Sequence, residues 1–177
     1  MKNIIAFSGS NGSKSINQQL VTYAASLIGA NVEVIDLRDF DTAIYSVDLE
    51  AEGIPSSIER LGAKLAAADG FVISTPEHNG TLSAFFKNIV DWLSRFDGKF
   101  LGGKPVLLLS TSPGGGGAVN ALADMEAKLK YFGGELAGKY SLGSFQKHFD
   151  ADKGQLHSEE EVEKLEKAIE SFVSRLA

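Results

Sequence analysis

Short runs of aliphatic and β-branched residues alternate along this chain with longer segments in which apolar residues recur every three or four positions. The short runs lie at residues 4–7, 32–35, 71–73 and 106–109. Most of them lack the polar alternation of a half-exposed strand, so we interpret them as strands buried on both faces. A fifth strand is expected over residues 136–142.

The segments between these runs have the spacing of amphipathic helices. Helices are expected around residues 20–28, 58–68, 82–93 and 118–132, and after Ser158. Gly133 and Gly134 are placed to end the fourth helix as C-cap residues. Ser158 and Glu161 have the pattern of a capping box at the start of the last one. Strict alternation of strands and helices predicts an α/β fold, a parallel sheet with helices on both faces.

Length and composition limit the function. At 177 residues the chain suits one domain over residues 1–177, and 44% hydrophobic with 23% charged residues is ordinary for a globular protein. A net charge of −6 without clustered Lys and Arg disfavours a nucleic-acid partner. Cysteine is absent, which is compatible with the cytoplasm, and the histidines lack metal-ligand spacing. We expect no bound metal and no membrane partner, since no uncharged stretch suits a spanning helix.

Polar loops follow three of the predicted strands. The first loop covers residues 8–17, the second 75–81 and the third 111–117, and all are rich in Gly, Ser, Thr or Asn. In doubly wound sheets, ligands bind beyond the carboxyl ends of the strands, beside the switch in strand order. We therefore expect the three loops to form one binding site. Residues 39–57 and 146–157 are expected to be longer surface connections, which could act as lids or partner surfaces.

The first loop leads directly into a helix, so free N–H groups and the positive end of the helix dipole would face an anion there. The hydroxyls of Ser10 and Ser15, the Asn17 amide and Lys14 could add donors. This pattern favours a phosphate. The glycine spacing does not match the triphosphate-binding P-loop. The alternative is a capped turn without a ligand.

The second and third loops suit a flat heteroaromatic ring. Main-chain N–H groups of residues 76–80 could bind its carbonyl oxygens, and the alternative is an ordinary turn with Thr81 or Asn79 as helix cap. Four consecutive glycines at residues 114–117 suggest close approach of the backbone to a ring edge, and the alternative is a flexible linker. Residues 114–119 do not complete the dinucleotide fingerprint.

A family resemblance rests on these loops. The sequence Pro76-Glu77-His78-Asn79-Gly80, followed by Phe86-Lys87-Asn88-Ile89-Val90-Asp91-Trp92, resembles the Pro-Glu-Tyr-Asn-Gly and Leu-Lys-Asn-Ala-Ile-Asp-Trp signature of the NADPH-dependent FMN reductase family. That family includes chromate, quinone and azo-dye reductases. The first loop resembles the family's Gly-Ser-x-Arg-x-x-Ser-x-Asn, with Gly12 in place of Arg, and the third its Ser-x-Gly-rich segment. The resemblance covers nearly the whole chain.

The resemblance implies a flavodoxin-like three-layer α/β/α fold with five parallel strands in the order 2-1-3-4-5, and FMN as the cofactor. The first loop would hold the phosphate, the second the face of the isoalloxazine and the third its edge. The residues implied to bind FMN are Ser10, Ser15, Ile16, Asn17, Pro76, Glu77, His78, Asn79, Gly80, Ser112, Gly114, Gly115, Gly116 and Gly117. Because the cofactor carries the chemistry, no side chain is expected to be a catalyst.

The implied activity is an FMN-dependent NAD(P)H oxidoreductase. Electrons would pass in ping-pong order from NADPH or NADH through FMN to a small acceptor: a quinone, azo dye, chromate or flavin. N–H groups near residues 77–80 and after Gly117 are expected to raise the flavin potential. The family also implies a homodimer or a dimer of dimers (homotetramer). Two alternatives stay open: a flavodoxin-type electron carrier without nicotinamide activity, and a regulatory protein with a decayed flavin site, motivated by Gly12 and His78.

Overall fold

A parallel sheet of five strands forms the centre of the computed structural model, which describes residues 2–29 and 31–176. The strand order is β2-β1-β3-β6-β7, which is 2-1-3-4-5 when the five strands are numbered along the chain. The predicted fold class and strand order are therefore confirmed. The strands are β1 Asn3–Ser8, β2 Asn31–Val34, β3 Gly70–Ser74, β6 Pro105–Thr111 and β7 Glu135–Leu142.

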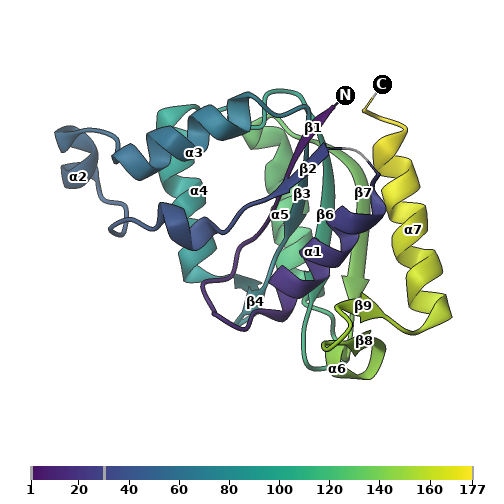
Figure 1. The fold of residues 1–177 in the computed structure, drawn as a ribbon. Helices are drawn as coiled ribbons and strands as arrows, with labels where there is room; N and C mark the ends of the chain where they lie inside the picture. Colours follow the sequence, from purple (N-terminus) through teal and green to yellow (C-terminus); the bar gives the residue numbers. More distant parts are fainter. Residues whose placement is uncertain (1, 30, 177) are drawn as a thin grey trace.

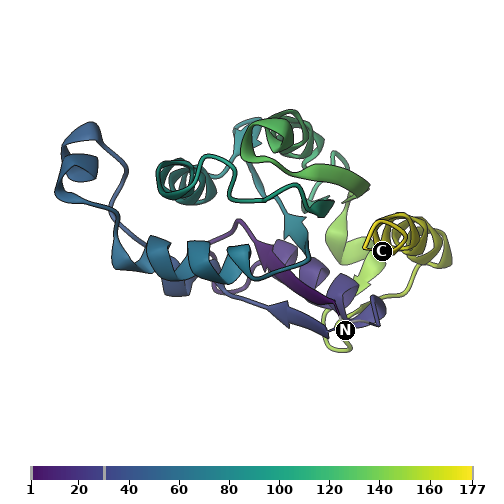
Figure 2. The ribbon, with the colours of Figure 1, turned by 90° about the horizontal axis from the view of Figure 1, so that it is seen from above.

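Helices cover both faces of the sheet, so that it forms the middle of three layers (Figures 1 and 2). Alternate residues of the central strands point to opposite faces and enter two separate cores. One core packs against α3 Ser56–Ala66, α4 Ala84–Phe96 and α5 Val119–Phe132. The other packs against α1 Ile16–Leu27 and α7 Glu159–Val173.

Strands β1, β3 and β6 are buried along almost their whole length, as the sequence predicted. The prediction was wrong for β2, in which Val32 is half-buried and Asn31, Glu33 and Val34 are exposed. The cause is position, because β2 lies at the edge of the sheet. An edge strand is covered less completely than a central one.

The predicted helix ends had mixed outcomes. Gly133 adopts the left-handed conformation (φ 77°) and its N–H donates to Leu129 O, as expected of a C-cap. The predicted capping box at Ser158 is wrong, because that side chain makes no capping hydrogen bond. Glu161 instead accepts a hydrogen bond from Tyr140 Oη at 2.8 Å and pairs with Lys164. A contact from a distant strand has replaced the local one.

The two longer connections contain short elements. The first includes the 3-10 helix η1 Leu37–Phe40 and α2 Val47–Glu52, which projects from the body of the fold (Figure 1). We call residues 41–55 the arm. The second includes α6 Phe145–His148 and the hairpin of β8 Phe149–Asp150 with β9 Gln155–Leu156. Within the described residues, no helix combines the length and apolar character needed to cross a bilayer.

Candidate functional site

The three polar loops meet at the carboxyl ends of β1, β3 and β6, where Asn17 joins them. This side chain is buried. Its Oδ1 accepts hydrogen bonds from Ser74 Oγ at 2.8 Å and Thr111 N at 3.1 Å, while its Nδ2 donates to Thr111 O at 3.1 Å. One amide hydrogen is therefore engaged, which leaves the other for the phosphate contact that the sequence predicts.

The first loop fits an anion. Ser15 caps α1, its Oγ accepting from Gln18 N at 3.2 Å, and Ser10 Oγ accepts from Gly12 N at 3.2 Å. Both hydroxyls thus keep their hydrogens for another acceptor. Across residues 2–29 and 31–176, no protein acceptor takes the backbone N–H of residues 13, 14, 16 or 17. These free donors are available to water or to an anion, since such groups at a helix start are satisfied by caps, water or ligands.

Gly9 brings the first loop close to α4. Its N–H donates to Ser74 O at 2.9 Å, and its carbonyl accepts from Ser83 Oγ at 2.6 Å. A Cβ added at Gly9 would lie 2.5 Å from Cγ of Phe86, so no larger residue fits without displacing the ring. Ser83 was not predicted, although a serine just before a strongly amphipathic segment is a recognisable capping signal.

The second loop is a β-hairpin. Strands β4 Glu77–His78 and β5 Thr81–Leu82 pair across Asn79 and Gly80, whose φ angles of 53° and 79° are those of a type I′ turn. Pro76 is buried, whereas His78, Asn79 and Gly80 are exposed at the rim. The alternative of Thr81 or Asn79 as helix cap is wrong. Ser83 caps α4, with Oγ accepting from Phe86 N at 3.1 Å.

The Glu77 side chain reaches from this hairpin to the start of α5. Its Oε2 accepts from Asn120 N at 2.9 Å and Ala121 N at 3.1 Å, and its Oε1 accepts from Asn120 Nδ2 at 3.2 Å. Glu77 thereby joins the second loop to the first turn of α5, which follows the third loop. This contact was not predicted from the sequence, because the partners are 43 and 44 residues away.

The third loop is anchored at both ends, so the flexible-linker alternative is wrong. Phe145 N donates to Ser112 O at 3.1 Å, and Ser144 N donates to Gly114 O at 2.8 Å. Ser110 Oγ and Ser141 Oγ donate to Gly117 O at 2.6 Å and 2.8 Å. Gly114 and Gly116 face open space, since a Cβ there would meet nothing within 4 Å. The backbone of this loop is therefore held in place and exposed, which makes it accessible to the edge of a flat ring.

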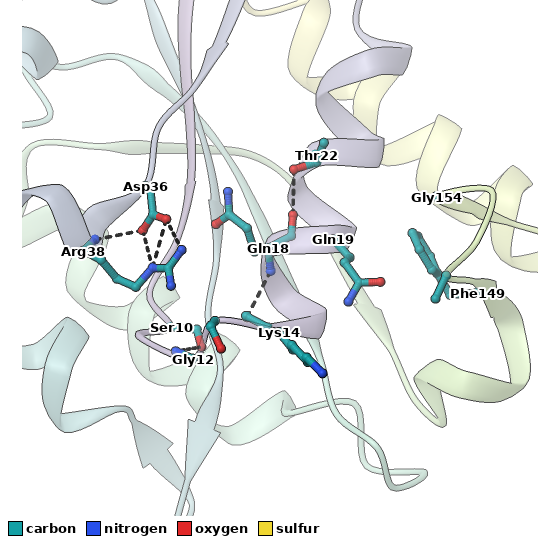
Figure 3. Close-up of a pocket in the computed structure, with 13 residues that line it drawn as sticks. Ser10, Gly12, Lys14, Gln18, Gln19, Thr22, Asp36, Arg38, Phe149 and Gly154 are labelled. Carbon is teal, nitrogen blue, oxygen red and sulfur yellow. Dashed lines mark hydrogen bonds and ion pairs between the residues drawn. The ribbon is translucent and has the colours of Figure 1, made fainter.

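A hollow of about 290 Å³ opens beside the first loop. Figure 3 shows Asp36 and Arg38 on one side of it and Phe149 and Gly154 on the other, with α1 between them. The second and third loops do not line it, so it adjoins the first loop alone of the three. None of these four residues was predicted as a site residue from the sequence, because they carry no motif and come from separate connections.

Charge in this hollow is mostly paired. Hydrogen bonds from the Arg38 side chain lower the pKa of the Asp36 carboxyl, so these two charges offset each other. Lys14 is exposed and makes no ion pair with the described residues. It is therefore the cation best placed to add positive charge to the first loop. No group of three or more acidic or histidine side chains within the described residues could hold a metal ion.

Comparisons with known proteins agree with this geometry. The chain is 29% identical to an NAD(P)H-dependent FMN reductase of Pseudomonas aeruginosa, over 98% of this chain and 96% of that protein. It is 28% identical to a quinone reductase of Escherichia coli K12, over 96% and 92%. Among solved structures, the flavoenzyme NAD(P)H:acceptor oxidoreductase FerB of Paracoccus denitrificans superposes with a TM-score of 0.81 at 27% identity, covering 99% and 97%.

The family model described as NADPH-dependent FMN reductase matches residues 2–148, which is most of the chain and includes all three loops. The resemblance seen in the motifs is thereby confirmed, and the chain belongs to the NADPH-dependent FMN reductase family.

Proposed function

We propose that this chain binds FMN at the three loops and uses it to pass electrons from NADPH or NADH to a small acceptor. The observation that carries the proposal is the set of free donors on the first loop, together with two hydrogen-bonded loops that have exposed backbone. Bound FMN would supply the redox chemistry, by accepting hydride from a nicotinamide and passing the electrons on. The protein supplies binding, orientation and charge.

The proposed roles follow the loops. N–H groups of the first loop, with the hydroxyls of Ser10 and Ser15, hold the phosphate. The hairpin tip around Asn79 lies against the ring, and the exposed glycines of the third loop border its edge. No side chain is needed as a catalyst. The FMN-binding residues predicted from the sequence keep their places in this proposal except Glu77, whose carboxylate binds the start of α5.

A quinone is the acceptor class that we propose to test first, because the E. coli relative is a quinone reductase. Two-electron transfer from reduced FMN to a quinone needs only an open ring face. His78 and Gly80 of the hairpin are exposed, so this side of the proposed flavin site is open to solvent and to an acceptor. The lack of cysteine suits a reducing compartment, so we propose that the protein acts in the cytoplasm.

We infer further that the protein is a homodimer or a dimer of dimers. The arm supports this proposal, because Ile44 and Val47 are 81% and 72% exposed. Exposed apolar side chains on a projecting segment are common at subunit contacts. Sedimentation at micromolar concentration tests it, and a monomer would reject it.

The deciding experiment is an absorption spectrum of the purified protein with added FMN, recorded before and after anaerobic NADPH. We expect bound-flavin bands that bleach with NADPH and return when a quinone is added. Parallel initial-rate lines would support the ping-pong order. Binding without bleaching would indicate a flavodoxin-type carrier, and failure to bind FMN would reject the proposed function.

A further inference from the structure

Helix α5 begins without a capping side chain of its own. Its N-cap residue, Ala118, is buried in the left-handed conformation (φ 60°) and has no side-chain oxygen to offer. Only a few per cent of non-glycine residues adopt a positive φ. The first-turn N–H groups of this helix therefore need an acceptor from elsewhere in the chain.

Glu77 provides that acceptor: its Oε2 accepts from the backbone N–H groups of Asn120 and Ala121, while its Oε1 accepts from the Asn120 side-chain amide. The helix start follows directly on the glycines of the third loop, and Glu77 itself belongs to the second loop. The carboxylate thus lies at the start of α5, next to both loops in the chain that are proposed to hold the isoalloxazine. A helix N-terminus carries roughly +0.5 charge, so one carboxylate turns a positive feature of the site into a net negative one.

A second contact joins the same hairpin to the same helix without changing this charge. Thr81 Oγ1 donates to Asp124 Oδ2 at 2.9 Å, about one turn into α5. The hairpin is therefore fixed to α5 at two points. Glu77 acts on both the position and the charge of the site, whereas Thr81 acts on position alone. A variant of Thr81 can therefore serve as the control for a change in hairpin position without a change in charge.

We propose that Glu77 is a positioning residue that caps α5 across the site and lowers the reduction potential of bound FMN. This inference rests on the proposed function. Reduction places negative charge on the flavin, which a nearby carboxylate disfavours. The proposed effect of Glu77 differs from the expectation drawn from the sequence, in which the N–H groups at the start of α5 were free to stabilise the negative charge of the reduced flavin. A lower potential makes the reduced cofactor a stronger donor to its acceptor.

The test is the two-electron midpoint potential of bound FMN, measured by equilibration with indicator dyes in wild type, E77Q and T81V. E77Q keeps an amide oxygen for the helix N–H groups but removes the charge. We expect reduced FMN to bind up to about tenfold more tightly relative to oxidised FMN, a positive shift of up to ~30 mV. T81V removes a neutral hydroxyl that donates to Asp124 and leaves the net charge of the site unchanged, so it should keep the wild-type potential.

Three outcomes would overturn the inference. They are an unchanged potential in E77Q, an equal shift in T81V, and loss of FMN by an E77Q protein whose unfolding midpoint is unchanged. The last would make Glu77 a cofactor ligand rather than a positioning residue. Wild type that fails to bind FMN would instead reject the proposed function, before any variant is compared.

A variant of opposite sign keeps the test decisive if E77Q does not fold. Val119, the first residue of α5, is 50% exposed, so V119E adds a carboxylate at the same helix start. We expect V119E to lower the potential and V119Q to leave it unchanged. A V119E potential equal to that of V119Q would overturn the inference.

Discussion

Asn17 and Thr111 share two hydrogen bonds although 94 residues separate them. The Asn17 amide donates to Thr111 O and accepts from Thr111 N, both at 3.1 Å. The same amide oxygen accepts from Ser74 Oγ at 2.8 Å. One buried side chain therefore fixes the start of α1 to the ends of β3 and β6. The site is built on this frame, which holds its loops in place before any ligand binds.

Replacing Asn17 with alanine should destabilise the fold. The change leaves buried groups of Ser74 and Thr111 without partners, and each such group costs about 1 to 3 kcal/mol. We expect the free energy of unfolding to fall by roughly 2 to 4 kcal/mol, measured by urea denaturation followed by circular dichroism. N31A is the matched control, because Asn31 is exposed on the edge strand. Equal effects of the two variants would contradict the assigned role.

Local patterns predicted most of the fold. Strands and helices were found because apolar spacing depends on near neighbours, and the Gly133 C-cap because its signal lies within one helical turn. The capping box at Ser158 failed for the converse reason. Its Glu161 accepts a hydrogen bond from Tyr140 of β7, which lies 21 residues earlier in the chain. Single-sequence patterns do not indicate such a competitor.

The same limit applies to the site. The first loop was predicted from a polar segment that leads into a helix, and its free N–H groups agree with that reasoning. The Glu77 contact was not predicted, since nothing near Ala118 shows which distant carboxylate caps α5. The hollow beside Arg38 was also missed, because it is formed by segments that meet only in three dimensions.

Replacing Asn88 with alanine should loosen the arm. Asn88 Oδ1 accepts from Tyr45 N at 2.8 Å, and its Nδ2 lies 3.2 Å from the carbonyl oxygens of Thr42 and Ala43. Losing these bonds leaves two polar contacts between α4 and the arm: Trp92 Nε1, 2.9 Å from Ala43 O, and the ion pair of Arg95 with Glu50 at 3.8 Å. We expect limited proteolysis within residues 41–55 to become several-fold faster, since local opening controls cleavage.

The control for this variant is K87A, which breaks the exposed ion pair of Lys87 with Asp91 on the same helix. Exposed pairs of this kind contribute little to stability. K87A should therefore be cleaved at the wild-type rate. A common rate for N88A and K87A, with fragments mapped by mass spectrometry, would show that Asn88 does not hold the arm.

Glu161 should contribute to a loss of stability in acid. Burial opposes its ionisation, but hydrogen bonds from Lys164 and Tyr140 outweigh that effect and lower its pKa below the ordinary 4.5. Because the folded-state pKa is the lower one, its contribution is complete above about pH 4.5 and is lost as pH falls through the folded value. In urea unfolding at a series of pH values, E161Q should lose less stability than wild type on acidification.

The neighbouring variant E160Q is the control for this effect. Glu160 also contacts Lys164, at 2.7 Å, but its side chain is 77% exposed. Solvent screens such a pair, so E160Q should follow the wild-type pH dependence. A pH profile of E161Q that coincides with those of E160Q and wild type would rule out Glu161 as a source of the acid sensitivity.

Replacing Gly12 with arginine should tighten FMN binding through the phosphate. The family pattern has Arg at this position, and a Cβ added here meets Ser10 Oγ at 3.5 Å, an ordinary contact. A charge-assisted hydrogen bond contributes about 1.5 to 3 kcal/mol, which is roughly tenfold or more in affinity. Titration should show this gain for G12R and not for G12A. Riboflavin, which lacks the phosphate, should bind both variants equally. A matching gain for riboflavin would mean that the first loop does not hold the phosphate.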